Sequence, residues 1–206
     1  MKALKKSPLS EAAAGLDPVV LFGKWFRRAE HSGIYKANAM TLATVAAGGR
    51  AATRTVLLKS HDSRGFIFFT NYRSQKAREL KRSANASLLF HWAILGRQVR
   101  IDGRVKKVAR AESEAYFATR PRDYQLGAWA SDQSSVVRSR KAMDKRMDAV
   151  KKKFFGRSVP CPAHWGGYRL APKRMEFWQE RPGRFHDRLR YTKIKTDRWR
   201  RERLAP

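Results

Sequence analysis

Apolar residues first recur at helical spacing between Asp17 and Gly33. The positions on this apolar face are Val19, Phe22, Phe26 and Ala29. Asp17 is a good N-cap, Pro18 suits a first helical turn, and Gly33 can end the element. The pattern therefore predicts one amphipathic helix near the start of the chain.

Short runs of alternating or continuous apolar residues follow, and they are typical of β-strands. These runs cover residues 40–47, 51–59, 66–70, 86–93, 97–108, 166–170, 174–179, 184–193 and 198–204. Turn sequences at 48–50 and 62–65 separate the first three runs, so this region reads as a meander. Gly103 lies inside a run and predicts a bend there.

Helical patterns are fewer and lie between the strands. They cover residues 74–80, 111–120 and about 135–155. Ser74 can cap the first of these helices, and Pro121 stops the second. Many strands and few helices predict a mainly β fold, a β-barrel with peripheral helices.

Composition supports one folded domain. The chain has 206 residues, 42% of them hydrophobic, with eleven Phe, six Trp and six Tyr. We expect a flexible basic arm over residues 1–16 and a single domain over residues 17–206. The single cysteine, Cys161, excludes an internal disulfide or a multi-cysteine zinc site, and it fits a reducing cytoplasm.

Charge is the strongest compositional signal. There are 46 Lys and Arg against 17 Asp and Glu, a formal charge of +29. Such a chain attracts nucleic acid, anionic membranes or phosphorylated small molecules, and charge does not choose among them. No apolar run reaches the about 18–20 residues of a membrane span, and Glu11 and Asp17 interrupt any signal peptide. We expect a cytoplasmic protein without membrane contact.

Common nucleotide and metal motifs are absent from the sequence. It has neither GxGxxG nor GxxxxGK[ST], and its five histidines lack the HExxH spacing. We therefore expect no metal site.

Two candidate anion sites lie on the strands of the first half. Arg54 and Lys59 bracket the apolar run RTVLLK and face opposite sides of a strand, so they can serve different anions or be two surface cations. In FTNYRSQKA, starting at residue 69, a strand feeds a helix N-terminus that carries Ser74 and Lys76. This arrangement suits a phosphate, although capping alone also explains it.

Two further candidates lie in the second half. Tyr116 and Arg120 are four residues apart on one helical face and can present a hydroxyl and a guanidinium to one oxyanion. If residues 184–193 form a strand, Arg184, His186 and Arg188 share one face. Two cations and an imidazole on one face indicate an anionic or electron-rich partner.

Together these stretches resemble the pyridoxine/pyridoxamine 5'-phosphate oxidase family. The similarity covers about residues 17–206 and includes NAMTLAT, RTVLLK, RQVR, RPRDYQLGAW, QSS, WGGYR, EFWQ, RFHDR and ERLAP. The resemblance implies an FMN-binding split β-barrel of Greek-key type and a homodimer with FMN at the interface. It also implies oxidation of pyridoxamine or pyridoxine 5'-phosphate by O2 to pyridoxal 5'-phosphate and H2O2, with hydride transfer from substrate C4' to flavin N5.

The resemblance also implies which residues form the site. Those expected at the FMN phosphate are Arg54, Gln75, Lys76, Gln133 and Ser134. Those expected at the rest of the cofactor are Thr55, Val56, Leu57, Leu58, Lys59, Phe69, Thr70, Gln98, Trp178 and Arg188. Those expected at the substrate are Lys59, Tyr116, Arg120, Tyr124, Arg184 and His186, of which Arg184 and His186 approach the pyridine ring as catalytic residues.

The sequence departs from the family pattern in three places. Gln75 stands where the family usually has Arg, which removes a cation from the FMN phosphate. Tyr124 stands where the family usually has a small residue at the substrate phosphate. The N-terminal Met-Arg-x-x-Tyr pattern is not recognisable in residues 1–15.

Two other functions remain open. One is a related split-barrel flavin oxidase with another substrate, as in phenazine pathways. The other is a basic nucleic-acid-binding protein, since residues 181–203 carry ten Lys or Arg against three acidic residues. We expect nucleic acid to bind only non-specifically, through charge.

Overall fold

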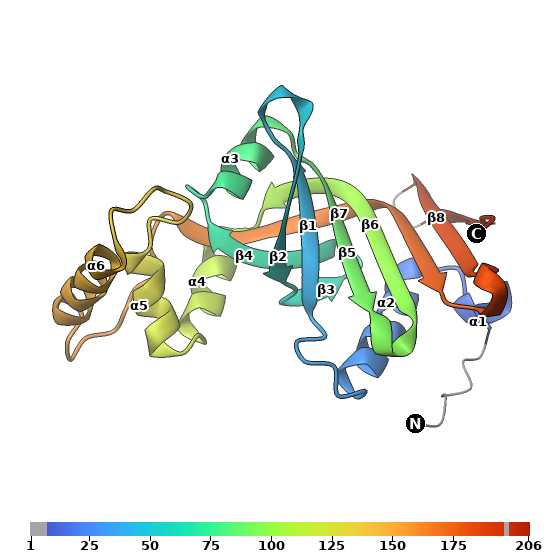
Figure 1. Ribbon diagram of the computed structural model, residues 1–206, viewed down its shortest axis with the longest axis horizontal. Helices are drawn as coiled ribbons and strands as arrows, with labels where there is room; N and C mark the ends of the chain where they lie inside the picture. Colours follow the sequence, from blue (N-terminus) through green and yellow to red (C-terminus); the bar gives the residue numbers. More distant parts are fainter. Residues whose placement is uncertain (1–7, 196–197) are drawn as a thin grey trace.

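A nine-stranded antiparallel sheet forms the centre of the molecule, as the computed structural model in Figure 1 shows. The structure describes residues 8–195 and 198–206. The strands are β1 (Ala39–Val45), β2 (Ala51–Leu57), β3 (Ser60–Asp62), β4 (Gly65–Asn71), β5 (Asn85–Trp92), β6 (Arg97–Lys107), β7 (Trp165–Gln179), β8 (Asp187–Lys195) and β9 (Arg198–Arg203). The helices are α1 (Glu11–Ala14), α2 (Pro18–Glu30), α3 (Gln75–Arg82), α4 (Arg110–Ala118), α5 (Arg122–Ala130) and α6 (Arg140–Lys153). The predicted mainly β fold is confirmed.

The sheet curls until its two edges meet. Its strand order is β2-β1-β5-β6-β7-β4-β3, with β8 added beside β7 and β9 beside β8. Strand β2 leads into β3 through Leu58 and Lys59, and the Lys59 N–H donates to the Ile67 carbonyl of β4 at 2.8 Å. The edges are therefore joined, and the strands enclose a barrel core.

Helix α2 packs against this core with the apolar face that its sequence predicts. Asp17 Oδ1 accepts a hydrogen bond from the Val19 N–H at 2.7 Å, which confirms the expected cap. Phe22 is fully buried, and its ring meets those of Phe66 and Phe90 edge-on at 4.9 and 5.0 Å. These edge-to-face contacts help fix the helix on the barrel.

Strand β7 is a single long strand, where the sequence predicts two short ones. Pro172 interrupts the apolar pattern but lies opposite Gly103, at the point where the β6–β7 register shifts. A proline removes little there, because the hydrogen-bond ladder is already irregular. A Cβ on Gly103 would lie 2.1 Å from the Ala171 carbonyl oxygen, so only glycine allows this approach. The bend predicted at Gly103 is confirmed.

Three further elements, β3, α5 and α6, also differ from the sequence prediction. Strand β3 occupies residues that were expected to lie between strands, and α5 follows directly on α4. Pro121 ends α4 but also precedes the first turn of α5, a position that its fixed φ suits. Helix α6 begins at Arg140 rather than near Ser135, because the Ser139 hydroxyl accepts from the Ala142 N–H at 3.1 Å. No helix in the described ranges is long and apolar enough to cross a bilayer.

The N-terminal arm also needs a correction. Residues 8–16 pack on the hairpin of β8 and β9, where Leu9 is buried and Arg203 Nε donates to Glu11 Oε1 at 2.8 Å. The Tyr191 hydroxyl donates to the Gly15 carbonyl at 2.9 Å. Only residues 1–7 of the expected arm lie outside the described residues.

Candidate functional site

A cavity of about 790 Å³ lies between the barrel strands β2 and β4 and the helices α4 and α5. Many residues that the sequence assigned to FMN or substrate line it, although they come from distant parts of the chain. They are Thr55, Val56, Leu57, Lys59, Phe69, Thr70, Lys76, Tyr116, Arg120, Tyr124 and Gln133. The fold therefore brings most of the predicted residues from residues 54–133 together.

Lys76, at the start of α3, provides a cation inside this cavity. Its ammonium lies 3.3 Å from Thr70 Oγ1, 3.2 Å from Gln133 Oε1 and 3.5 Å from Ser74 Oγ. All three partners are uncharged oxygens, and the side chain is largely buried. Burial lowers the pKa of Lys76, and the nearby Arg54 guanidinium lowers it further. A bound anion would favour the charged ammonium and so offset the effects of burial and of Arg54 on the pKa of Lys76.

Two other residues expected at the FMN phosphate do not line the cavity. Arg54 Nη2 is bound to the buried carboxylate of Glu79 at 2.7 Å, and Gln75 Nε2 donates to the other oxygen of that carboxylate at 2.9 Å. The same Arg54 also donates to Thr44. Although burial would raise the pKa of Glu79, hydrogen bonds from these three neighbours hold it below its usual value.

A second cationic area lies against the aromatic wall of the cavity. The Phe69 ring stacks on Tyr116 at 4.1 Å and on Trp165 at 5.3 Å. The Arg120 guanidinium lies over the Trp165 ring at 4.6 Å, and Lys59 Nζ lies 5.7 Å from the centre of the Tyr116 ring. Arg120 Nη1 is buried without a hydrogen-bond partner, and burial lowers the pKa of this guanidinium. Such an unpaired donor favours an anionic ligand.

Ser74 and Tyr124 differ in detail from what the sequence suggests. Ser74 is the N-cap residue of α3 as predicted, but its hydroxyl donates to the Asn71 carbonyl at 2.7 Å and makes no capping hydrogen bond. Tyr124 lies on α5 and is 63% exposed at the rim of the cavity. Its bulk therefore narrows the entrance rather than filling the interior.

The remaining predicted residues gather elsewhere, at the far end of β7. Gln98, Trp178 and Arg188 lie opposite one another on β6, β7 and β8, so they share one face of the sheet. The His186 ring lies 4.6 Å from the Trp178 ring. We call Gln98, Trp178, His186 and Arg188 the rim group.

The predicted strand face over residues 184–188 is wrong in its first part. Arg184 belongs to a short 3-10 turn, Pro182–Arg184, and has φ 60°, while β8 begins only at Asp187. Gly183 and Arg184 both take positive φ, which reverses the chain and prevents a strand there. His186 instead accepts from the Arg181 N–H at 3.1 Å through Nδ1.

The cavity and the rim group are far apart in one chain. Trp165 lines the cavity and Trp178 belongs to the rim group, thirteen positions along the same strand. At about 3.3 Å per residue this corresponds to about 40 Å. In Figure 1, β7 extends from the region of α4 to that of β8.

Two further residues expected at the cofactor lie outside both groups. Leu58 is buried in the core, and Ser134 is exposed with φ 71°.

Several lining residues were missed by the sequence reasoning. The largest group comes from α5, namely Asp123, Gly127 and Ala128, and Trp165 comes from β7. The donor-rich stretch after Pro121 was a usable signal, but it was not recognised as a helix. Across the described residues, no three His, Cys, Asp or Glu side chains form a group that could hold a metal ion.

The curled antiparallel sheet and the cavity at its side place the chain in the class of split-barrel proteins. The fold is similar to a pyridoxamine 5'-phosphate oxidase-related, FMN binding protein from Nostoc punctiforme, with a TM-score of 0.74 and 18% identity over 93% of this chain and 100% of that one. It is also similar to PhzG from Burkholderia lata in complex with tetrahydrophenazine-1-carboxylic acid, with a TM-score of 0.87 and 31% identity over 93% and 94% of the two chains.

Sequence comparison identifies the family. Residues 28–154 match the family described as pyridoxamine 5'-phosphate oxidase, and residues 165–206 match the pyridoxine 5'-phosphate oxidase C-terminal dimerisation region. Pyridoxine/pyridoxamine 5'-phosphate oxidase from Rubrobacter xylanophilus is 49% identical over 98% of this chain and 92% of its own length. The enzyme of that name from Methylibium petroleiphilum is 50% identical over 100% of this chain and 96% of its own length.

The chain therefore belongs to the pyridoxamine 5'-phosphate oxidase family. It is an oxidoreductase, and its family implies a flavin cofactor. The resemblance expected from the sequence is confirmed.

Proposed function

We propose that the protein is an FMN-dependent oxidase that converts pyridoxamine or pyridoxine 5'-phosphate to pyridoxal 5'-phosphate. The observation that carries this proposal is the pair of cationic areas in one cavity. Lys76 lies among neutral oxygens at one, and Arg120 has an unpaired buried N–H group at the other. Two separate anion sites beside an aromatic wall suit a phosphorylated cofactor and a phosphorylated substrate.

Each area has a separate task in this proposal. Lys76, with Thr70 and Gln133, would hold the FMN phosphate, and the Thr55–Leu57 backbone would line the flavin. Lys59, Tyr116 and Arg120 would hold the substrate phosphate, so that the carbon to be oxidised lies at a fixed distance from the flavin. FMN, when bound, would supply the hydride acceptor N5 for substrate C4', with O2 taking up the electrons and protons as H2O2. With pyridoxamine 5'-phosphate, the imine left at C4' would add water and release ammonia to give the aldehyde.

A second chain would complete the site. Because the rim group lies about 40 Å along β7 from the cavity, one cofactor cannot touch both groups of the same chain. In a homodimer, the cavity of one protomer would face the rim group of its partner, with FMN between them. The C-terminal dimerisation region, which contains Trp178, His186 and Arg188, supports this arrangement.

A different substrate is the second candidate. PhzG, whose structure was solved in complex with tetrahydrophenazine-1-carboxylic acid, has nearly the same fold as this chain. Tyr124 at the cavity rim is the feature that favours a substrate other than a vitamer phosphate. Two cationic areas favour the phosphorylated substrate, because a single carboxylate would need only one. The cytoplasmic location and the non-specific binding of nucleic acid stay predictions.

Anaerobic reduction of the bound flavin tests the proposal directly. Purified protein with a measured FMN content is mixed with each vitamer phosphate, and the flavin absorbance is followed. We expect bleaching by at least one vitamer and, on admission of air, equal amounts of H2O2 and pyridoxal 5'-phosphate. Arg120→Ala should weaken substrate binding by at least about tenfold, because it removes a charged hydrogen bond.

The controls separate the two substrates. Arg122→Ala removes a neighbouring arginine whose guanidinium binds the carbonyls of Phe154 and Arg157 outside the cavity, so it should leave substrate binding unchanged. If flavin binds but neither vitamer reduces it, the substrate assignment is wrong. Reduction by tetrahydrophenazine-1-carboxylic acid instead would support the second candidate.

A further inference from the structure

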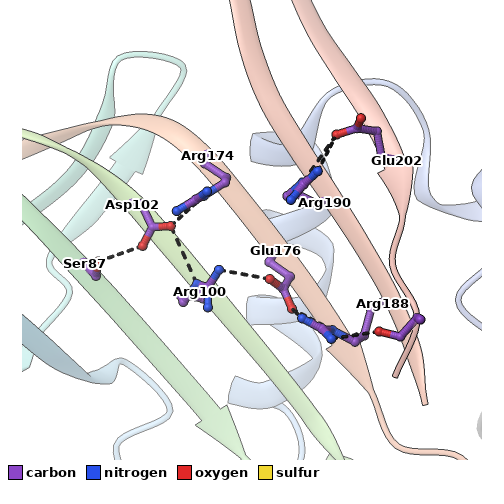
Figure 2. A network of polar contacts seen from close by, with 9 residues as sticks. Ser87, Arg100, Asp102, Arg174, Glu176, Arg188, Arg190 and Glu202 are labelled. Carbon is purple, nitrogen blue, oxygen red and sulfur yellow. Dashed lines mark hydrogen bonds and ion pairs between the residues drawn. The ribbon is translucent and has the colours of Figure 1, made fainter. Parts of the chain in front are cut away.

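A ladder of alternating charges crosses the sheet face that carries the rim group. Figure 2 shows it extending from Arg188 on β8 through Glu176 on β7 to Arg100 and Asp102 on β6. Register explains this alignment, because Arg100 lies opposite Glu176 and Asp102 lies opposite Arg174. These residues alternate with core residues along each strand and therefore share one face.

Glu176 is the central residue of this ladder. Its Oε1 accepts from both Nε and Nη2 of Arg188, at 2.9 and 2.8 Å. Its Oε2 accepts from Arg100 Nη2 at 3.1 Å. The Glu176 side chain is only 7% exposed, whereas that of Arg188 is 29% exposed. A buried carboxylate thus directs a more exposed arginine.

The far side of the ladder holds Glu176 in place. Arg100 Nε lies 3.6 Å from Asp102 Oδ2, the oxygen that also accepts from Arg174 Nε at 2.9 Å. The Ser87 hydroxyl donates to the other oxygen of Asp102 at 2.7 Å. Rotation of Glu176 would therefore break contacts on both of its sides.

Arg188 keeps donors available while it is held. A guanidinium has five N–H groups. Two bind Glu176, and one on Nη1 donates to the Ala205 carbonyl at 2.8 Å. Two N–H groups thus remain without a partner among the described residues, next to Trp178 in the same register row. The guanidinium is oriented before any ligand arrives, which lowers the entropy lost on binding.

We propose that Glu176 is a positioning residue for the cofactor site, acting by fixing the Arg188 guanidinium through the ladder of Arg100, Asp102 and Arg174. This inference rests on the proposed FMN site, because Arg188 is expected at the flavin. Glu176 itself would touch neither cofactor nor substrate.

Glu176→Gln is a sharp test of this role. The amide has one acceptor oxygen, so it can serve Arg188 or Arg100 but not both. We expect FMN to bind about tenfold more weakly, measured by quenching of flavin fluorescence on titration of the apoprotein. Glu202→Gln is the matched control, since it removes a carboxylate from the same face where Glu202 pairs with Arg190 at 3.0 Å. The control should bind FMN as the unmodified protein does.

A double-mutant cycle distinguishes positioning from general damage. If Glu176 acts through Arg188, Glu176→Gln should add no further loss of FMN affinity in an Arg188→Ala chain. A purely structural role would add its full effect in both chains. The midpoint potential of the bound flavin should also move to more positive values in Glu176→Gln and stay unchanged in Glu202→Gln, because a negative charge is lost beside the site.

The outcomes separate this inference from the proposed function. If the unmodified protein does not bind FMN, the proposed function fails. If it binds FMN and the losses from Glu176→Gln and Arg188→Ala are additive, the positioning role is wrong. Equal FMN affinities for Glu176→Gln and the unmodified protein would also overturn it. Thermal unfolding of each apoprotein shows whether the variants are folded.

Discussion

Single residues in the cavity present positive charge, and no ion pair with a carboxylate neutralises Lys76 or Arg120 among the described residues. Lys76 contacts only neutral oxygens, and Arg120 leaves a buried N–H group unpaired. The nearest carboxylate on α3, Glu79, is occupied by Arg54 and Gln75. The site is therefore electrostatically prepared for an anion, at some expense in stability of the empty protein.

Gln75 is the residue where a single change should improve cofactor binding. Gln75→Arg can keep the hydrogen bond to Glu79 that Gln75 makes at 2.9 Å, and it adds a cation next to Lys76. We expect FMN to bind at least about tenfold more tightly, because a hydrogen bond to a charged group contributes about 1.5–3 kcal/mol. Titration of apoprotein with FMN measures this change.

Two changes at Lys81 on the same helix control for the arginine side chain and for bulk charge. Lys81→Arg leaves the net charge unchanged, and Lys81→Gln removes one exposed cation outside the cavity. Neither should change FMN affinity by more than about twofold, since exposed charges are screened by salt. Unchanged FMN affinity in Gln75→Arg would mean that Glu79 retains the new guanidinium.

Among the secondary-structure elements, α1 and β9 form a clamp at the chain ends. Arg203 binds Glu11 through two hydrogen bonds and also donates to the Leu9 carbonyl at 2.9 Å. The hydrogen bond from Arg203 lowers the pKa of Glu11 from 4.5 to about 2. A lowered carboxyl pKa means that the clamp contributes fully above pH 4.5 and is lost as the pH falls through about 2.

Titration of the Glu11 carboxyl by NMR tests this clamp. We expect a midpoint near 2 in the unmodified protein and a clearly higher midpoint in Arg203→Ala, still below 4.5 because a backbone hydrogen bond and the Arg201 charge also lower the pKa. Arg200→Ala removes a neighbouring arginine that pairs with Glu202 and should leave the Glu11 midpoint low. A midpoint near 4.5 in the unmodified protein would show that the contact does not form in solution.

Elements with a clear local pattern could be predicted from the sequence, and those that depend on long-range pairing could not. Helix α2 carries its own cap at Asp17 and a regular apolar face. Strand β7 appears broken at Pro172 because nothing local shows that Gly103 of another strand lies opposite it. Helix α5 was missed because Pro121 both stops one helix and starts the next.

The candidate site divides in the same way. The Lys76 area could be predicted because a strand end, a serine and a lysine are close in sequence. The role of Glu79 on α3 could not be predicted, since its partners Thr44 and Arg54 come from strands β1 and β2. The error at Arg184 came from extending a strand through Gly183, whose positive φ the alternation of residues does not reveal.

At the scale of the whole molecule, most acidic residues are already paired. Asp62, Asp102, Glu176, Asp187 and Glu202 all form ion pairs with arginines. The excess of 46 basic over 17 acidic residues therefore remains largely unbalanced, and α6 alone carries seven Lys or Arg against two Asp. Nothing in the structure explains this surplus beyond the few cations of the cavity and rim group.

Mixed dimers test whether each site draws on two chains. Lys76→Ala damages the cavity and Arg188→Ala damages the rim group. In a dimer of one chain of each kind, one site carries both defects and the other carries none. We expect random mixing of the two inactive variants to restore tight FMN binding at about one in four sites, measured by stoichiometric titration.

Each variant, unfolded and refolded without the other, serves as the control and should show no sites that bind FMN tightly. If both groups belonged to the same chain, every site in the mixture would carry one defect. Mixing would then restore nothing, and the shared site would be contradicted.

The long strand β7 also has a consequence for synthesis. It pairs with β4, β6 and β8, yet it occupies residues 165–179 of 206. A ribosome must therefore release most of the chain before the barrel can close, while β4 and β6 each wait with an unpaired edge. Such edges can pair with other chains. Pairing across long sequence separations is also slow, so this stage of folding is where nascent chains are most exposed to aggregation.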